Sequence, residues 1–386
     1  MNIGINILHF KPGKVGGTET YLRNLLENLQ TVDTTNEYTL ILSRLNAPGI
    51  EIRGKNFRKL VKNYSIPSTG WFCRGVLRNT LKVDILRTVY DRLKLDVIHH
   101  PFTTLNPNRL KTKSILTFHD MQHEFYPEFF SADELEYRRQ TYRPSAEEAI
   151  RIVAISEHVK SCLVERYQLS PDKIDVIYNG FSAGYRIIDD PSKLLAIKNR
   201  YGLTRPFLYY PAATWPHKNH KKLLMAVKLL IDKHDFDGDL VLSGANFKAH
   251  SEVMQEASRL GLEKSIKALG YLPYEDLPAL FNLARIMVYP SLFEGFGIPL
   301  VEAMACGCPV ICSDRTSLPE VAGDAALQVD PTSPEDIAEK IWAAWNDEST
   351  LDLLRKRGLA RAAFFSWEEM ARKTLAVYRK TVETSR

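Results

Sequence analysis

Two glutamates set eight positions apart, Glu294 and Glu302, are the residues of this chain best suited to chemistry. The loop between them contains Gly295 and Gly297, which can adopt positive φ and let a ligand approach the backbone closely. Pro299 suits the first turn of a helix, and the free N–H groups of such a turn bind phosphate. Because carboxylates accept hydrogen bonds from hydroxyls, the segment predicts a ligand with both phosphate and hydroxyl groups, such as a nucleotide-sugar.

The predicted elements around this loop place it at the edge of a parallel sheet. Ile286–Tyr289 is a short apolar run that is typical of a buried strand, and Leu300–Ala305 predicts a helix. Gly307 and Pro309 are residues that commonly follow a helix end. In sheets whose strands alternate with helices, ligands bind at the carboxyl ends of the strands, and this loop starts at such an end.

Other polar residues follow predicted strands in the same way. Lys218 lies between the strand Phe207–Pro211 and the next helix, where a compact cation suits phosphate charge, although such a lysine can also be ordinary surface. His119 ends the strand Ser114–Phe118 beside Asp120, and it could bond a sugar hydroxyl or be a structural histidine. We favour the functional interpretation for both.

Two glycine-containing turns give weaker signals. Gly16 and Gly17 precede the first predicted helix and could cradle phosphate, but they lack the spacing of a dinucleotide fingerprint, so a plain turn is the alternative. Tyr271 and Leu272 follow another predicted strand, where backbone groups could contact a nucleobase or merely turn the chain.

The length of 386 residues and the order of the predicted elements indicate two α/β domains. Apolar strands and amphipathic helices alternate along the chain, which predicts doubly wound parallel sheets. The alternation breaks after Asn179-Gly180, so we place the boundary near residue 182. Strands are predicted at Asn2–Leu8, Tyr38–Leu42, Val97–His99, Ser114–Phe118, Ile152–Ala154, Lys173–Ile177, Phe207–Pro211, Leu240–Leu242, Ile266–Leu269, Ile286–Tyr289 and Val310–Ser313.

Composition argues against a membrane-spanning or disulfide-stabilised protein. The apolar content of 45% and the charged content of 25% are those of a globular protein, and no uncharged apolar run approaches the ~18 residues that span a bilayer. We expect no signal peptide, and five cysteines, an odd number, favour reduced thiols and the cytoplasm. Cys306, Cys308 and Cys312 match no common zinc spacing, so we interpret them as small core residues.

Positive charge is concentrated in residues 51–113. This basic window contains 14 Lys and Arg against four acids, a net +10, so the rest of the chain carries −5 of the overall +5. Within it, aromatic, aliphatic and basic residues alternate at near-helical spacing over residues 71–82. Such a pattern is typical either of a solvated helix packed on its domain or of a surface that binds anionic lipid headgroups. No nucleic-acid-binding motif accompanies the charge, so we expect no nucleic acid partner.

Taken together, these residues resemble the retaining glycosyltransferases of family four, which have the GT-B fold. The resemblance covers nearly the whole chain, and its most specific part is the E-x7-E motif that Glu294 and Glu302 match. Leu318–Gly323 is also similar to the family pattern. The resemblance implies two facing Rossmann-like domains with a cleft between them and a C-terminal crossover helix. Residues 1–182 plus 366–386 would then bind the acceptor, and residues 183–365 the donor.

The resemblance also implies roles for the candidate residues. Glu302 would bind the ribose hydroxyls, Glu294 would bind those of the transferred sugar, and His119 would line the reaction centre. Lys218 and backbone N–H groups would hold the diphosphate, and no metal or cofactor is expected. The residues expected at the donor are Gly16, Gly17, Thr214, Lys218, Tyr271, Leu272, Glu294, Gly295, Phe296, Gly297, Ile298, Pro299, Leu300 and Glu302, of which Glu294 and Lys218, with His119, are expected to be catalytic.

One position departs from the family pattern. Many relatives carry an arginine about six residues before the lysine, where this chain has Ala212. Either Thr214, His217 or another basic residue takes that role, or the phosphate site is less charged.

The function that the resemblance implies is transfer of a hexose from a nucleotide diphosphate sugar to a glycan or lipid-linked acceptor, in cell-surface polysaccharide or glycolipid synthesis. Mannose from GDP-mannose is the first candidate donor, and the inner face of the cell membrane is the expected place of action. One alternative is a nonhydrolysing nucleotide-sugar epimerase of the same architecture, which lacks the Glu294–Glu302 arrangement. A non-catalytic nucleotide-sugar-binding module is the other, and the complete set of site residues argues against it.

Overall fold

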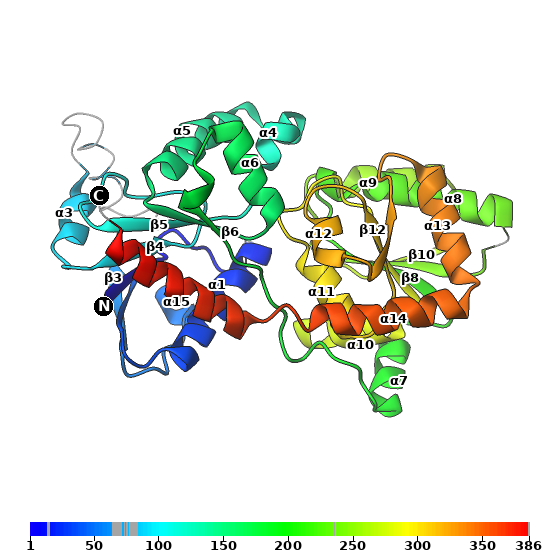
Figure 1. The fold of residues 1–386 in the computed structure, drawn as a ribbon. Coiled ribbons are helices and arrows are strands. Elements are labelled where there is room, and N and C mark those ends of the chain that lie inside the picture. The colour runs from blue at the N-terminus through cyan, green and yellow to red at the C-terminus, as the bar shows by residue number, and fades with distance from the viewer. Residues whose placement is uncertain are drawn as a thin grey trace. The chain divides into compact units, whose positions relative to one another are not determined.

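The computed structural model describes residues 1–13, 16–63, 72, 74, 76, 84–234 and 236–384, and it divides into two compact units. Unit 1 comprises Met1–Asn179 and Ser366–Arg386, and unit 2 comprises Gly180–Phe365. The division falls after Asn179, whereas the sequence placed the boundary near residue 182. Each unit is a parallel sheet with helices packed on its faces (Figure 1).

Unit 1 is built on a seven-stranded parallel sheet in its described part, with the order β3-β2-β1-β4-β5-β6-β7. Strands buried on both faces need continuous apolar runs, and Ile3, Ile5, Leu40 and Leu42 are fully buried. The strands are β1 (Asn2–Asn6), β2 (Glu37–Ser43), β3 (Phe57–Lys62), β4 (Val97–His100), β5 (Lys113–Phe118), β6 (Arg151–Ala154) and β7 (Ile174–Val176). The helices are α1 (Gly17–Val32), α3 (Ile85–Asp91), α4 (Gln122–Phe125), α5 (Ala132–Glu148), α6 (Glu157–Tyr167) and α15 (Trp367–Glu383).

The C-terminal helix α15 belongs to unit 1, although the whole of unit 2 lies between it and the other residues of unit 1 in the chain. It lies beside α1 (Figure 1). The hydroxyl of Tyr378 on this helix is 2.8 Å from Nδ1 of His99 in β4, and Lys380 pairs with Asp175 of β7 at 3.1 Å. The predicted crossover helix is therefore confirmed.

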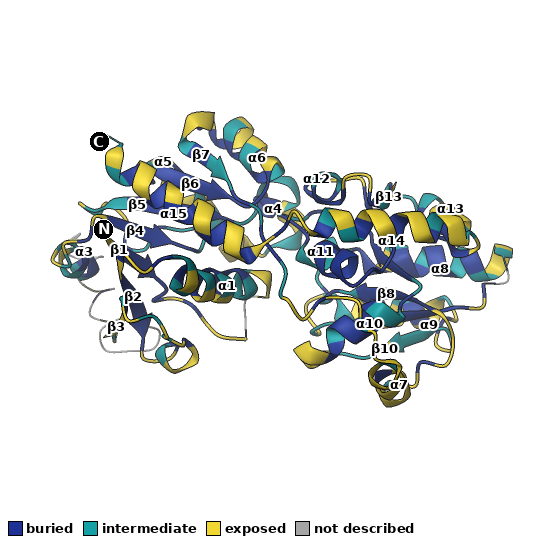
Figure 2. Cartoon of the chain, turned by 60° about the horizontal axis from the view of Figure 1, so that its bottom comes forward, coloured by how far each residue is buried: buried dark blue, intermediate teal, exposed yellow. Residues whose placement is uncertain are grey.

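Unit 2 is built on a six-stranded parallel sheet with the order β10-β9-β8-β11-β12-β13. Its central strands are dark and buried in Figure 2, while the outward faces of its helices are exposed. The strands are β8 (Phe207–Pro211), β9 (Asp239–Ser243), β10 (Ile266–Ala268), β11 (Ile286–Tyr289), β12 (Val310–Ser313) and β13 (Ala326–Val329). The helices are α7 (Pro191–Arg200), α8 (His220–His234), α9 (His250–Arg259), α10 (Leu277–Leu283), α11 (Ile298–Ala305), α12 (Leu318–Ala322), α13 (Pro334–Trp345) and α14 (Glu348–Ala362).

The predicted fold class, two doubly wound α/β units, is confirmed, but two edge strands were missed. In β3 only Phe57 is buried, and the strand carries Arg58, Lys59 and Lys62, so it is not an apolar run. β13 lies at an edge of the other sheet and is only partly buried. An edge strand covers less core than a central one, so its apolar signal is weak. The predicted helical stretch at 71–82 lies mostly outside the described residues.

None of the described helices combines the length and the apolar character that crossing a membrane requires.

Candidate active site

The loop that follows β11 turns into α11 at Gly297, whose φ of 96° is left-handed. A Cβ at this position would lie 2.6 Å from Cδ2 of Leu318, so both the backbone angle and the space require glycine. Gly297 thereby sets the direction of α11, and α11 carries Glu302 among its buried residues. The predicted strand, glycine loop and helix around the two glutamates are all present.

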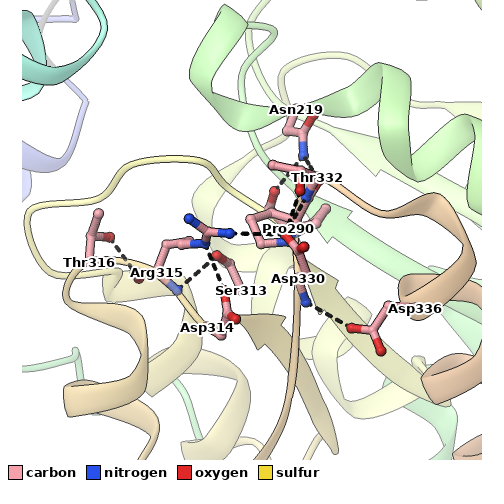
Figure 3. Close-up of polar contacts among 10 residues, drawn as sticks. Asn219, Pro290, Ser313, Asp314, Arg315, Thr316, Asp330, Thr332 and Asp336 are labelled. Atoms are coloured by element: carbon pink, nitrogen blue, oxygen red, sulfur yellow. Dashed lines mark hydrogen bonds and ion pairs between the residues drawn. The ribbon is translucent and has the colours of Figure 1, made fainter.

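Asn219 joins three loops at the carboxyl edge of the sheet (Figure 3). Its side-chain amide donates to the carbonyls of Pro290 at 3.0 Å and Pro331 at 2.7 Å, which follow β11 and β13. Asn219 has a left-handed φ of 61°, which asparagine tolerates better than most residues. This clamp fixes the position of the preceding residue, Lys218.

The loop after β12 holds the backbone of Glu294. The hydroxyl of Thr316 accepts a hydrogen bond from the Glu294 amide at 3.1 Å, and the hydroxyl of Ser317 donates to the Glu294 carbonyl at 3.0 Å. The neighbouring Arg315 is paired with Asp314 at 3.0 Å and with Asp330 at 3.2 Å (Figure 3). These contacts were not predicted, because they join loops that are far apart in the sequence.

Lys218 and Glu294 form a close ion pair. The lysine ammonium is 2.6 Å from Oε1 of Glu294 and donates to the Tyr289 hydroxyl at 2.8 Å, and the two charged side chains are only 15% and 12% exposed. Burial alone would raise the pKa of Glu294, but the Lys218 ammonium and the His217 ring nearby outweigh it and hold that pKa below its ordinary value. The structure therefore brings the two residues together as a buried, charged pair.

Glu302 has a different environment. It is 7% exposed, and burial raises its pKa to about 7, while the hydroxyls of Tyr185 and Tyr274 offset part of that effect. Tyr185 comes from the segment just after the unit boundary, and Tyr274 from the turn before α10. Sequence analysis missed both tyrosines, and only their position near the boundary and a strand end could have indicated them.

The remaining predicted residues of unit 2 contribute in different ways. The hydroxyl of Thr214 accepts a hydrogen bond from the Phe247 amide at 2.8 Å, which ties together the loops after β8 and β9. Tyr271 is 83% exposed, whereas Leu272 is buried. The amide of Leu300 already donates to the Gly297 carbonyl at 3.0 Å.

The glycine loop itself is part exposed and part buried. Gly295 and Ile298 are half-buried, as is Pro299, whereas the Phe296 side chain is buried. Its ring meets the Phe365 ring edge-on at a centroid distance of 5.6 Å. Phe296 therefore anchors the loop in the core of unit 2. Since proline has no amide hydrogen, Pro299 cannot donate a backbone hydrogen bond to phosphate.

Ala212 is 7% exposed and lies against Gly244, where an added Cβ would be 2.6 Å from the Ala212 carbonyl carbon. The loop is therefore closely packed at this position. Thr214 and His217 were named as possible substitutes for the missing arginine. The Thr214 hydroxyl accepts a hydrogen bond from the Phe247 amide, whereas His217 lies close enough to Glu294 to lower the pKa of that carboxyl group.

His119, Gly16 and Gly17 belong to unit 1. Nε2 of His119 donates to the Pro101 carbonyl at 2.8 Å, which leaves Nδ1 as the acceptor of the neutral ring, and burial lowers its pKa. The Gly16 carbonyl accepts from the Glu19 amide at 2.9 Å at the start of α1. Within unit 1, His119 follows β5 and the glycine pair follows β1, so all three lie after strand ends.

The cysteines of unit 2 lie in its core. Cys306, Cys308 and Cys312 are buried and free, and burial raises the pKa of all three thiols, that of Cys308 and Cys312 to about 12.

Across the described residues, no three His, Cys, Asp or Glu side chains are grouped so that they could hold a metal ion.

Two family models match consecutive parts of the chain. Residues 15–184 match Glycosyltransferase Family 4, and residues 196–361 match Glycosyl transferases group 1. The chain is 35% identical over 285 residues to O-antigen chain mannosyltransferase B of Escherichia coli, with 74% of each chain covered. It is 29% identical over 278 residues to O-antigen chain mannosyltransferase RfbU of Salmonella typhimurium, covering 71% of this chain and 72% of the relative.

Solved structures agree with this fold. Sucrose-phosphate synthase of Thermosynechococcus elongatus superposes with a TM-score of 0.78 at 20% identity, covering 100% of both chains. HepE of Anabaena in complex with UDP and glucose gives a TM-score of 0.74 at 18% identity, covering 98% of this chain and 100% of that one. The fold and the glutamate pair thus define a GT-B glycosyltransferase. The chain belongs to glycosyltransferase family 4. This membership supports a transferase and argues against the epimerase alternative.

Proposed function

We propose that the protein is a retaining, metal-independent mannosyltransferase that takes mannose from GDP-mannose. Its acceptor would be a glycan or lipid-linked glycan in the synthesis of a cell-surface polysaccharide. The observation that carries the proposal is the buried pair of Lys218 and Glu294 at the carboxyl edge of the unit 2 sheet, with Glu302 on the following helix. The two O-antigen mannosyltransferases to which the chain is similar support the choice of sugar and pathway.

In this proposal the charged pair serves the leaving group. Transfer breaks the bond between C1 of the sugar and the diphosphate, and negative charge develops on the diphosphate oxygen. The Lys218 ammonium would stabilise that charge together with backbone amides of the glycine loop before Pro299, which is the electrostatic role that gives the largest effects in enzymes. Glu294 would accept hydrogen bonds from hydroxyls of the transferred sugar, and Glu302 would accept them from the ribose hydroxyls.

The test is transfer from a panel of nucleotide-sugars to an acceptor glycan, with the anomeric configuration of the product determined by NMR. We expect GDP-mannose to be used with retention and without loss in EDTA. The Glu294→Ala variant should remain folded but transfer at least about 100-fold more slowly. Glu339→Ala, an exposed glutamate on α13, is the matched control and should transfer normally. Epimerised donor in place of transfer, or an inverted product, would overturn the proposal.

We also propose that unit 1 docks on an anionic lipid surface on the inner face of the membrane. The exposed apolar side chains of unit 1 include Leu45 (67%), Val61 (44%), Phe72 (65%) and Val76 (45%). Leu45 follows β2 and Val61 lies near the end of β3, whose register pairs Ser43 with Lys62. Basic and apolar side chains therefore share the carboxyl edge of these strands, which suits anionic headgroups above an apolar layer.

Sedimentation with vesicles tests this docking. Wild type should bind phosphatidylglycerol vesicles more strongly than phosphatidylcholine vesicles, and Val61→Glu should weaken that binding several-fold. Leu353→Glu, at a residue that is 47% exposed on α14 of unit 2, is the matched control and should bind as wild type does. Equal binding to both lipids, or an unchanged Val61→Glu variant, would count against the surface.

A further inference from the structure

The carboxyl group of Glu302 lies beside a buried hydroxyl group that lacks a partner. Tyr185 is 1% exposed, and its hydroxyl makes no hydrogen bond of standard geometry. Its ring is held by the Tyr274 ring at a centroid distance of 5.5 Å and by the Phe281 ring at 5.9 Å. A buried hydroxyl without a partner is costly, so its position near Glu302 calls for an explanation.

Tyr274 approaches the same carboxyl group from another loop. Its side chain is 48% exposed, and its hydroxyl oxygen lies 3.3 Å from Oγ of Ser182. Ser182 and Tyr185 belong to one segment, which follows the unit boundary, and Tyr274 belongs to the turn that precedes α10. Both phenols also interact with Glu302, so two separate segments of unit 2 converge on one glutamate.

We propose that Tyr185 and Tyr274 are positioning residues that orient the Glu302 carboxylate to accept both ribose hydroxyls of the nucleotide donor. The inference rests on the proposed function, in which Glu302 binds the ribose. A carboxylate has about four acceptor sites, so two phenols and two ribose hydroxyls saturate it. A donor that lacks the 2′-hydroxyl leaves one buried acceptor site empty, and sites of this kind reject such analogues strongly.

The charge of Glu302 depends on the same two hydroxyls. Burial raises its pKa to about 7, and the nearby hydroxyls of Tyr185 and Tyr274 act in the opposite direction. The other titratable groups that face Glu302 are Tyr209, Tyr289 and Cys306, whose pKa values burial raises, so they stay neutral. Each phenol thus favours the ionised form. Removing one raises the pKa of Glu302 further, so a higher pH is needed before the carboxylate accepts the ribose hydroxyls.

The experiment is calorimetric binding of GDP-mannose and UDP-glucose, with their 2′-deoxy counterparts, to the full chain between about pH 5.5 and 8.5. Intact nucleotide-sugars are used because the terminal phosphate of a free nucleotide would itself titrate at about pH 6. In wild type we expect affinity to rise with pH through about 7 and the 2′-deoxy donor to bind at least about tenfold more weakly.

Tyr185→Phe and Tyr274→Phe each remove one hydroxyl and keep the ring. Either should move the pH midpoint of donor binding upward by about half a unit to one unit. Each should also reduce the preference for ribose several-fold. Tyr38→Phe is the matched control, because the Tyr38 hydroxyl donates to a buried carboxylate, Asp33, at 2.6 Å in unit 1. It should lower stability but leave the pH midpoint unchanged.

The outcomes separate this inference from the function on which it rests. If wild type binds and transfers a sugar but both phenylalanine variants keep the wild-type midpoint and ribose preference, the inference is wrong and the proposed function stands. A midpoint that moves equally in Tyr38→Phe also overturns it, since the change would then reflect stability. If wild type binds no nucleotide-sugar at any pH, the proposed function and the inference both fail.

Discussion

Glu294 and Glu302 lie eight residues apart and are buried to a similar degree, yet their pKa values shift in opposite directions. Burial disfavours the charge of both carboxylates. At Glu294 the ammonium of Lys218, 2.6 Å away, outweighs burial and keeps the carboxylate ionised. At Glu302 the neighbours are phenol hydroxyls, which reduce the effect of burial without cancelling it. The charge of the partner, and not the depth of burial, decides the ionisation of each glutamate.

The contrast divides the edge of the unit 2 sheet into two regions with different chemistry. The region around Glu294 contains opposite charges: the Lys218 ammonium suits a diphosphate, and the Glu294 carboxylate suits a sugar hydroxyl. Around Glu302 the groups are neutral and polar, which suits the recognition of hydroxyls. Two predictions test whether the partners create this difference, and a third tests the loop that joins the two glutamates.

The largest effect is expected for Lys218→Met, which leaves Glu294 buried beside an apolar side chain. Turnover should fall by about 10²–10³, because a preorganised cation for the leaving group is lost. The pKa of Glu294 should rise above its ordinary value, so that both glutamates then shift in the same direction; carboxyl NMR titration measures this. Lys221→Met removes an exposed lysine paired with Glu252 and serves as the control. A Glu294 pKa that stays low would refute the comparison.

Glu302→Gln is expected to change how stability depends on pH. The pKa of Glu302 rises from 4.5 to about 7 on folding, so its stabilising contribution is complete below pH 4.5 and is lost as pH rises through 7. That loss amounts to about 3 kcal/mol. Glutamine cannot ionise, so the variant should lack this decrease when the free energy of unfolding is measured against pH. Glu339→Gln should keep the wild-type slope, and a variant at position 302 that also keeps it would contradict the assignment.

The smallest effect is expected for Gly297→Ala, which lies between the two glutamates. The variant should lose about 2 kcal/mol of unfolding free energy, from its left-handed backbone and from the close contact with Leu318. Gly261→Ala is the matched control, since Gly261 has a φ of 68° but nothing within 4 Å of an added Cβ, and it should lose about 1 kcal/mol. Equal losses in a denaturant titration would show that the packing against Leu318 is unimportant.

The sequence predicted the elements that carry strong local signals. Strands such as β8, β11 and β12 coincide with the predicted ranges, because a central parallel strand is a continuous apolar run. The edge strands β3 and β13 escaped prediction, because an edge strand is less buried and its apolar pattern is weak. Two of the predicted site residues, Lys218 and Glu294, lie in the loops that follow β8 and β11.

The sequence by itself determined the two-unit α/β architecture, the family and the pair of glutamates, because periodicity and a motif with fixed spacing are local properties. Only the tertiary structure decided how those glutamates differ. Lys218 is 76 residues from Glu294, and Tyr185 comes from a segment that no spacing connects to Glu302. A pKa depends on the charges and hydroxyls within a few ångströms, and the folded chain brings these together from distant positions.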